Sequence, residues 1–323
     1  MKIFLFILIS FLSFSLFSQD VRPNILILFA DDQRADALGA YDNSYIKTPN
    51  LDELAKNGIL FKNSYVMGGH HGAICAPSRA MLLTGKNLFH VYDKLAGVET
   101  WPMYFAKFGY QTFATGKWHS EQSAFEDSFQ EADNVFLGGM SDHYAVPVRK
   151  MIKGKLTEPE IKSYSTDLFA NAAIHFIEEY GQSEKKNPFF CYVAFTAPHD
   201  PRSPREDYIG YYPDQTIPVP GNFKEIHPFI FDDFMVRDEM LSPWPRTPEI
   251  IQQNLSDYYG LVSHLDHRIG EIIQTLKNNG IYENTIIIYA ADNGLAIGSH
   301  GLLGKQNLYE HSIKMASCLK IVM

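Results

Sequence analysis

Four short runs of apolar residues stand out along the chain, and each passes directly into side chains that can do chemistry. They span residues 24–30, 111–116, 189–197 and 285–291. The runs are rich in β-branched and aromatic residues and show no alternation of apolar and polar positions, which is typical of strands buried on both faces of a mainly parallel sheet. We therefore expect these runs to form the centre of one sheet.

Segments with the periodicity of an amphipathic helix lie between the runs, at residues 50–57, 166–180 and 255–279. Asn50 is the expected N-cap of the first helix, and glycines follow the first and third. Alternation of strands and helices predicts an α/β fold, a mainly parallel central sheet with helices on both faces. Residues 120–165 and 201–248 lack either pattern, and we expect them to be long loops that rise over the functional site.

The side chains that follow the apolar runs should meet at one edge of the sheet, because ligands in open α/β folds bind beyond the carboxyl ends of the strands. The residues expected there are Asp31, Asp32, Lys117, His119, His199, Asp292 and Asn293. The three aspartates and the asparagine offer oxygen ligands, which favour Ca²⁺ or Mg²⁺ over Zn²⁺. An alternative interpretation is that Asp-Asp and Asp-Asn-Gly are turn residues after strands.

A further helix is expected after Cys75, in the sequence Cys75-Ala-Pro-Ser-Arg79. Pro77 suits the first turn, and Gly85 marks the end. Cys75 would then lie at a helix N-terminus, where free N–H groups and the helix dipole favour an anion. Arg79 would lie one turn along on the same face. The alternative is a buried cysteine with a purely structural role.

The segment from Cys75 to Arg79, followed by Thr84-Gly85, resembles the signature of the sulfatase family, Cys-x-Pro-Ser-Arg…Thr-Gly. Further family blocks occur in the same order over residues 23–310. Residues 24–32 resemble the opening strand with its metal aspartates, 115–119 the Gly-Lys-x-His segment, 197–199 the Pro-His segment, and 292–305 the last active-site block. The resemblance implies an alkaline-phosphatase-like fold. It also implies that a maturation enzyme oxidises Cys75 to formylglycine (3-oxoalanine).

The resemblance also implies a metal site and a reaction. The metal ligands would be Asp31, Asp32, Asp292, Asn293 and the modified Cys75, with Ca²⁺ as the expected ion and Mg²⁺ as the alternative. One hydroxyl of the hydrated formylglycine would attack sulfur and displace the substrate alcohol. Deprotonation of the other hydroxyl would then release sulfate, which splits one difficult step into two easier ones.

Five further side chains receive roles from the same resemblance. Arg79 and His119 would hold the aldehyde hydrate, with His119 as the base for its collapse. Lys117 and Lys305 would neutralise the sulfate oxygens, and His199 would protonate the leaving alcohol. The expected substrate is a sulfated carbohydrate, with an aryl or small alkyl sulfate as the alternative. Asp200 and Arg202 are candidates for contact with its sugar or alcohol part.

The net charge limits which partners the protein can have, and the N-terminal residues indicate where it is located. With 37 acidic and 28 basic residues among 323, the chain carries a formal charge of −9 and has no general attraction for nucleic acid. Lys2 and the apolar run 3–17 predict a signal peptide over residues 1–19. That run is shorter than the ~18–20 residues of a bilayer span, so we expect no stable membrane anchor. The mature chain would be exported to the periplasm or beyond.

The C-terminal part gives a further expectation. Family members continue after the position of Lys314 with another sheet strand and a smaller subdomain, whereas residues 315–323 are poorly patterned and include Cys318. We therefore expect residues 20–323 to form a sulfatase catalytic domain truncated at its C-terminus. With three cysteines, a disulfide framework is not expected. The alternatives to a sulfatase are a phosphonate or phosphodiester hydrolase of the same superfamily and an inactive truncated fragment.

Overall fold

The computed structural model describes residues 22–184, 187–213, 216–230 and 235–321, so the expected signal peptide lies outside the described residues. Within these ranges the chain forms a seven-stranded sheet in the order β2-β11-β10-β1-β9-β3-β4. Five strands are mutually parallel: β1 (Asn24–Ala30), β3 (Gln111–Trp118), β4 (Glu131–Leu137), β9 (Phe189–Ala194) and β10 (Thr285–Ala291). At one edge, β11 (Ser317–Lys320) runs antiparallel to β10, and β2 (Ile59–Leu60) runs antiparallel to β11.

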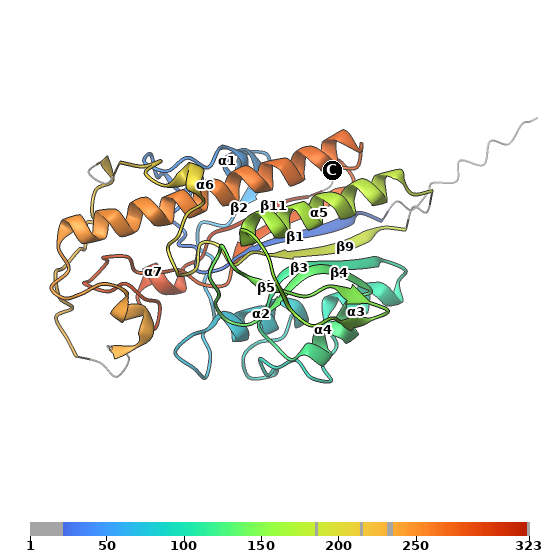
Figure 1. Ribbon diagram of the computed structural model, residues 1–323, viewed down its shortest axis with the longest axis horizontal. Coiled ribbons are helices and arrows are strands. Elements are labelled where there is room, and N and C mark those ends of the chain that lie inside the picture. The colour runs from blue at the N-terminus through green and yellow to red at the C-terminus, as the bar shows by residue number, and fades with distance from the viewer. Residues whose placement is uncertain (1–21, 185–186, 214–215, 231–234, 322–323) are drawn as a thin grey trace, which may run out of the picture.

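Helices cover both faces of the sheet (Figure 1). One layer holds α1 (Pro49–Lys56), α5 (Ser165–Gln182) and α6 (Pro248–Asn278), and the other holds α2 (Cys75–Thr84), α3 (Trp101–Lys107) and α4 (Gln122–Ser128). Successive side chains of β1 point to opposite faces of the sheet. Leu26 packs in the core beneath α5 and α6, and Ile27 packs in the core beneath α2 to α4. Burial on both sides explains why the strand shows no polar alternation.

The expected α/β fold is confirmed, and the four apolar runs are its central strands. The expected boundaries of all three helices were wrong, by one or two residues for α1 and α5 and by more at the start of α6. Helix α1 begins at Pro49, with Thr48 rather than Asn50 at the N-cap position. Helix α6 begins at Pro248, where the Thr247 side chain accepts a hydrogen bond from the Ile250 amide. The first turns of α6 are largely polar, so hydrophobic periodicity did not reveal them.

Two segments that lacked a sequence pattern contain more structure than expected. Residues 120–165 hold α4, β4 and two short hairpin sheets, which pair β5 (Pro147–Val148) with β8 (Glu160–Ile161) and β6 (Met151–Ile152) with β7 (Lys155–Leu156). Residues 201–248 are a long connection with the short 3₁₀ helices η2 (Glu206–Tyr208) and η5 (Arg237–Leu241). The C-terminal residues, which have no clear sequence pattern, contain strand β11, in which Cys318 is buried.

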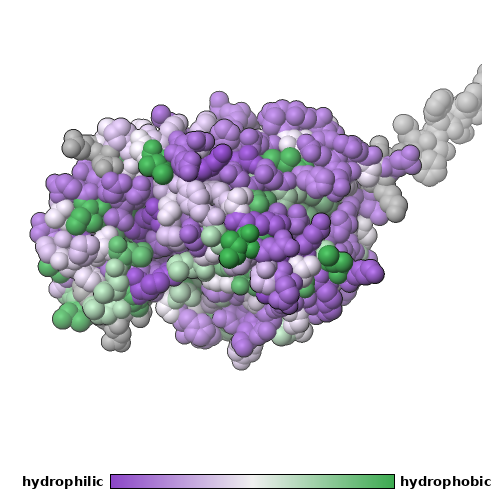
Figure 2. Space-filling model, viewed as in Figure 1, coloured by the Kyte–Doolittle hydropathy of each residue, from purple (hydrophilic) through white to green (hydrophobic). Residues whose placement is uncertain are grey.

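The remaining elements are the 3₁₀ helix η1 (Gly39–Tyr41) and the short helix α7 (Glu310–Ile313). In the described part of the chain, no helix has both the length and the apolar character that a bilayer crossing requires. The face seen in Figure 2 is mostly hydrophilic, with isolated hydrophobic residues. The carboxyl ends of β1, β9, β10 and β3 lie at the same edge of the sheet, which positions the candidate site.

Candidate active site

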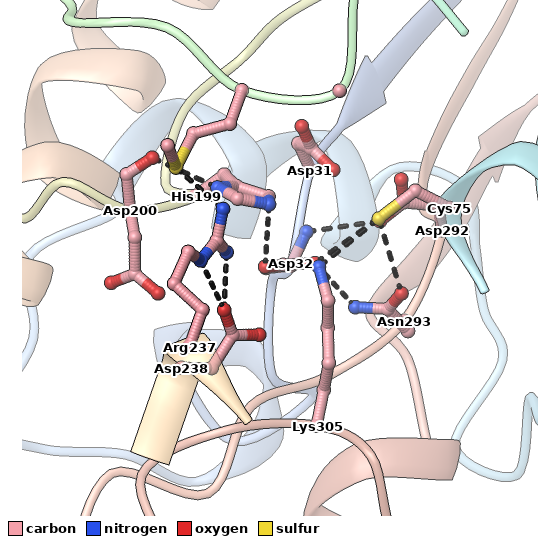
Figure 3. A network of polar contacts seen from close by, with 12 residues as sticks. Asp31, Asp32, Cys75, His199, Asp200, Arg237, Asp238, Asp292, Asn293 and Lys305 are labelled. Carbon is pink, nitrogen blue, oxygen red and sulfur yellow. Dashed lines mark hydrogen bonds and ion pairs between the residues drawn. The ribbon is translucent and has the colours of Figure 1, made fainter. Parts of the chain in front are cut away.

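The carboxyl edge of the sheet gathers the residues that the sequence pattern placed there. Asp31 and Asp32 follow β1, Asp292 and Asn293 follow β10, and His199 lies in the turn after β9 (Figure 3). All five are at least 96% buried. Burial of so many polar groups is favourable only if they pair with one another or bind a ligand.

Cys75 is the first residue of α2 and is only 2% exposed. Its Sγ lies 3.1 Å from the Lys305 Nζ and 3.7 Å from both Asp32 Oδ1 and Asn293 Oδ1. Burial, reinforced by the charge of Asp292, raises the pKa of the Cys75 thiol well above its usual value. The unmodified side chain is therefore a protonated thiol and a poor nucleophile, since nucleophilic cysteines react as thiolates.

Each carboxylate of the cluster has a cationic partner. Lys117 Nζ donates to Asp31, and Lys305 Nζ donates to Asp32 Oδ2 at 2.6 Å. Arg79 holds Asp292 through two bonds to Oδ2, from Nε at 3.2 Å and from Nη2 at 3.1 Å. The two lysines and Arg79 thus offset the negative charge of the carboxylates.

The three carboxylates of the cluster differ in the direction in which their pKa values are shifted. Burial raises the pKa of Asp32 to about 7, although Lys305 opposes the change. Burial and the neighbouring Asp31 also raise the pKa of Asp292. Burial acts in the same direction on Asp31, but the neighbouring positive charges, Lys117 foremost, outweigh it and hold its pKa well below the usual range. Crowded carboxylates of this kind would be stabilised in their ionised form by a divalent cation.

The donor set fits such a cation. One ligand atom each from Asp31, Asp32, Cys75 and His199 lies within 4.8 Å of the others. Asp31 Oδ1 is buried and accepts no hydrogen bond from any described residue, with Arg79 Nη2 the ion-pair partner at 3.5 Å. The Asn293 amide lies beside the group, within hydrogen-bond reach of Asp32. Oxygen donors from carboxylate and amide groups suit Ca²⁺ or Mg²⁺.

The two expected catalytic histidines differ in their hydrogen bonds. His199 donates from Nδ1 to the Asp200 carbonyl at 2.9 Å, so its Nε2 is the free nitrogen, 3.4 Å from Asp32 Oδ2. Burial and the charge of Lys305 lower the pKa of His199 well below its usual value. Burial and Lys117 lower the pKa of His119 to about 4, and its Nδ1 has no hydrogen-bond partner among the described residues. Both rings are neutral near pH 7.

A cavity of about 480 Å³ opens above the Cys75 side chain. Its lining residues are Gly72, Ala73, Cys75, His119, Gly139, Met140, His199, Val236, Arg237, Asp238, Lys305 and Gln306. The long connection 201–248 contributes three of them, so it does reach over the site. Arg79 and Lys117 lie beneath this surface, where Lys117 also donates to the Gly139 carbonyl at 2.7 Å.

Asp200 and Arg202, the candidates for contact with the sugar or alcohol part of the substrate, pair with each other. Neither residue lines the cavity, and both side chains are nearly fully buried, with Arg202 Nε 3.2 Å from Asp200 Oδ1. Arg202 also bonds Asn254 of helix α6. The pair fixes the turn after His199 to that helix, which is a structural role.

Sequence reasoning missed the group that holds the loop carrying Lys305. Glu239 accepts hydrogen bonds from the Leu303 and Gly304 amides, at 3.0 and 2.7 Å, and pairs with the buried Arg246 at 2.8 Å. Asp238 Oδ2 accepts from Gln306 Nε2 at 2.8 Å. These acidic residues lie in a stretch without periodicity, and neighbouring Asp and Glu in a loop carry no signal of such contacts.

Comparison with known proteins adds to this geometry. A family model described as sulfatase matches residues 23–315. The chain belongs to the sulfatase family. It is 27% identical to an N-acetylglucosamine-6-O-sulfatase of Bacteroides thetaiotaomicron, across 91% of this chain and 62% of that protein. The chain spans 57–62% of the length of this relative and of the mouse and human iduronate 2-sulfatases, to which it is 26% identical.

Solved structures agree with the sulfatase fold. BT4656, determined in complex with its substrate D-glucosamine-2-N,6-O-disulfate, matches 93% of this chain and 71% of its own, with a TM-score of 0.71 and 26% identity. The phosphonate monoester hydrolase of Agrobacterium radiobacter matches 92% of this chain and 68% of its own, with a TM-score of 0.66. At 22% identity, the second likeness concerns the fold alone.

Proposed function

We propose that this protein is a sulfuric ester hydrolase that uses formylglycine made from Cys75 and a bound divalent cation. The observation that carries the proposal is the position of Cys75, at the N-terminus of α2 and within 3.7 Å of Asp32, Asn293 and Lys305. A protonated thiol has no evident use among these charges. An oxidised side chain that offers oxygen to a cation and to the substrate would suit them.

When present, the formylglycine hydrate supplies the nucleophile and the cation polarises the sulfate group. The residues of the chain have the remaining tasks. Lys305, with its Nζ between Cys75 and Asp32, and Lys117 would balance the negative charge of the sulfate oxygens. Arg79 lies one turn after Cys75 in α2 and donates a hydrogen bond to Asp292. It would therefore fix residue 75 and Asp292 relative to each other.

The two histidines would move the protons. His119 is neutral at pH 7, lines the cavity beside Cys75 and can accept a proton from the hydrate. His199 has its Nε2 on the side of the cluster, 3.4 Å from Asp32 Oδ2, and in this proposal it would protonate the leaving oxygen. It would gain that proton when the anionic substrate binds, because burial and Lys305 otherwise hold its pKa well below the usual value.

The substrate we propose is a sulfated carbohydrate. A cavity of about 480 Å³ is of the size of small-molecule sites in general. Relatives of this chain include proteins named for N-acetylglucosamine 6-sulfate and iduronate 2-sulfate. Export to the periplasm or beyond is part of the proposal and rests on residues 1–19. The maturation enzyme that oxidises Cys75 would be its obligatory partner.

Phosphonate or phosphodiester hydrolysis is the second candidate, favoured by the fold shared with phosphonate monoester hydrolases. Matched 4-nitrophenyl esters separate the two. Protein co-produced with a formylglycine-generating enzyme should hydrolyse 4-nitrophenyl sulfate with a kcat/KM well above that for 4-nitrophenyl phosphate and phenylphosphonate. A preference for the phosphorus esters would replace the proposal with the second candidate. Turnover of neither class would favour an inactive chain.

A further inference from the structure

Arg237 occupies an unusual place in the cavity wall. It begins η5 in the long connection, and its side chain is 48% exposed. Lys305, the other lysine or arginine in the lining, is 2% exposed and is engaged with Asp32. Among the lining residues that the structure describes, Arg237 is therefore the solvent-exposed lysine or arginine. Figure 3 shows it on one side of Asp32, with Cys75 and Asn293 on the other.

Two buried acidic residues connect the backbone after Arg237 to the loop that carries Lys305. Asp238 is 2% exposed; its Oδ1 accepts from Arg237 Nε at 2.7 Å and from Nη2, while its Oδ2 accepts from Gln306. The adjacent Glu239 bonds the amides of Leu303 and Gly304. Arg237 and the loop that carries Lys305 thus share one buried scaffold, which fixes their separation.

The guanidinium of Arg237 retains unused donor capacity. Asp238 engages Nε and Nη2 on one edge. The remaining nitrogen, Nη1, contacts the thioether sulfur of Met140 at 2.7 Å, and a thioether is a weak acceptor. A carboxylate or sulfate oxygen would be a far stronger partner, because charge-assisted bonds from arginine to oxyanions are roughly twice as strong as neutral ones. The planar guanidinium also suits groups that present two oxygens.

We propose that Arg237 binds a second anionic group of the substrate, a sulfate or a carboxylate, while the scissile sulfate lies at Cys75. This inference rests on the proposed sulfate-ester hydrolysis and names the substrate class more narrowly: a saccharide with at least two negative charges. The buried Asp238 sets the orientation of the guanidinium and is not itself accessible to the sugar.

The competing interpretation is that Arg237 only neutralises Asp238. The two interpretations differ in what loss of the guanidinium does to matched substrates. A structural role predicts that Arg237→Ala changes the turnover of singly and doubly charged substrates by the same factor. A binding role predicts a selective loss for the doubly charged ones, mainly in KM.

The test compares kcat/KM for two pairs of sugars in the formylglycine-containing protein. The first pair, glucosamine 6-sulfate and glucosamine N,6-disulfate, measures the effect of a second sulfate. The second pair, idose 2-sulfate and iduronate 2-sulfate, measures the effect of a carboxylate. In at least one pair, we expect the wild type to prefer the doubly charged sugar by tenfold or more. Arg237→Ala should reduce that preference at least tenfold, and Arg237→Lys, which keeps the charge without the planar fork, should reduce it less.

Arg205→Ala is the matched control, because Arg205 is 42% exposed, pairs with Asp167 and lines a different cavity. It should leave the preference unchanged. Thermal unfolding of all variants checks that they fold. Equal preference of the wild type within both pairs, or a preference that survives Arg237→Ala, would overturn the inference while 4-nitrophenyl sulfate turnover still upheld the proposed function. If the wild type did not hydrolyse 4-nitrophenyl sulfate, both the proposed function and this inference would be overturned.

Discussion

At the residue scale, the site combines groups that the sequence reveals with groups that it conceals. Asp31, Asp292 and His199 could be placed because the two aspartates directly follow buried strands and His199 lies in the turn after a third. Parallel strands bring their carboxyl ends together. Arg237 and Glu239 could not, because their contacts depend on the path of a loop without periodicity. Side-chain pairing across such a loop is set by tertiary packing, which a single sequence does not encode locally.

The role proposed for His199 predicts a dependence on the leaving group. His199→Ala should lower kcat/KM for an alkyl sulfate by roughly 10²–10⁴-fold, the usual contribution of a general acid. The loss for 4-nitrophenyl sulfate should be much smaller, because nitrophenolate departs without protonation. Steady-state kinetics with both esters measure the difference. Equal losses for the two esters would show that His199 positions the cluster rather than donating a proton.

At the element scale, the central strands that bury both faces were predictable and the outer strands were not. Runs such as residues 285–291 are apolar throughout, whereas β4 begins Glu-Ala-Asp-Asn and β11 is the short Ser-Cys-Leu-Lys. β4 is an edge strand, paired on one side only, and edge strands are often polar. β11 is short and pairs with β2 over two residues. The sheet order and the antiparallel β11 follow from pairings between segments far apart in sequence.

Strand β3 contains one position where only glycine fits. Gly116 has a φ of +96°, and a Cβ built there would lie 1.9 Å from the Ala194 carbonyl oxygen of β9. Gly116→Ala should therefore destabilise the fold by roughly 2–5 kcal/mol, from backbone strain and overpacking together. It should also reduce activity, because Lys117 is the next residue. Urea unfolding monitored by circular dichroism gives the free energy of unfolding.

Gly154→Ala is the control for the strain contribution. Gly154 has a φ of +76°, and nothing lies within 4 Å of a Cβ built there. Its cost should be only about 1–2 kcal/mol, the penalty for an L-residue in the left-handed region. A Gly116→Ala variant no less stable than Gly154→Ala would contradict the close approach of β3 to β9.

At the scale of the whole molecule, the fold buries a cluster of carboxylates in a chain that already carries a net charge of −9. Lysines 117 and 305 with Arg79 offset the repulsion within the cluster. A divalent cation bound there would add stability, because it binds the folded chain and has no assembled site in the unfolded one. The site is thus coupled to the stability of the domain.

Chelation should lower the melting temperature, and Ca²⁺ or Mg²⁺ should restore it better than Zn²⁺. Binding at a hundred times Kd contributes about 2.7 kcal/mol, which corresponds to roughly 5–10 °C for a large domain. Asp292→Ala should weaken this response. Differential scanning fluorimetry with elemental analysis of the purified protein provides the measurement. A melting temperature indifferent to chelator and cations, in protein that contains no metal, would contradict the metal site.

The conversion of Cys75 tests the central claim most directly. Samples produced with and without a formylglycine-generating enzyme are digested, and mass spectrometry gives the converted fraction of the Cys75 peptide, with Cys191 and Cys318 as internal controls. Turnover of 4-nitrophenyl sulfate should rise in proportion to that fraction and be absent in Cys75→Ala, while both control cysteines remain unmodified. Full turnover by unconverted protein or by Cys75→Ala would contradict the account.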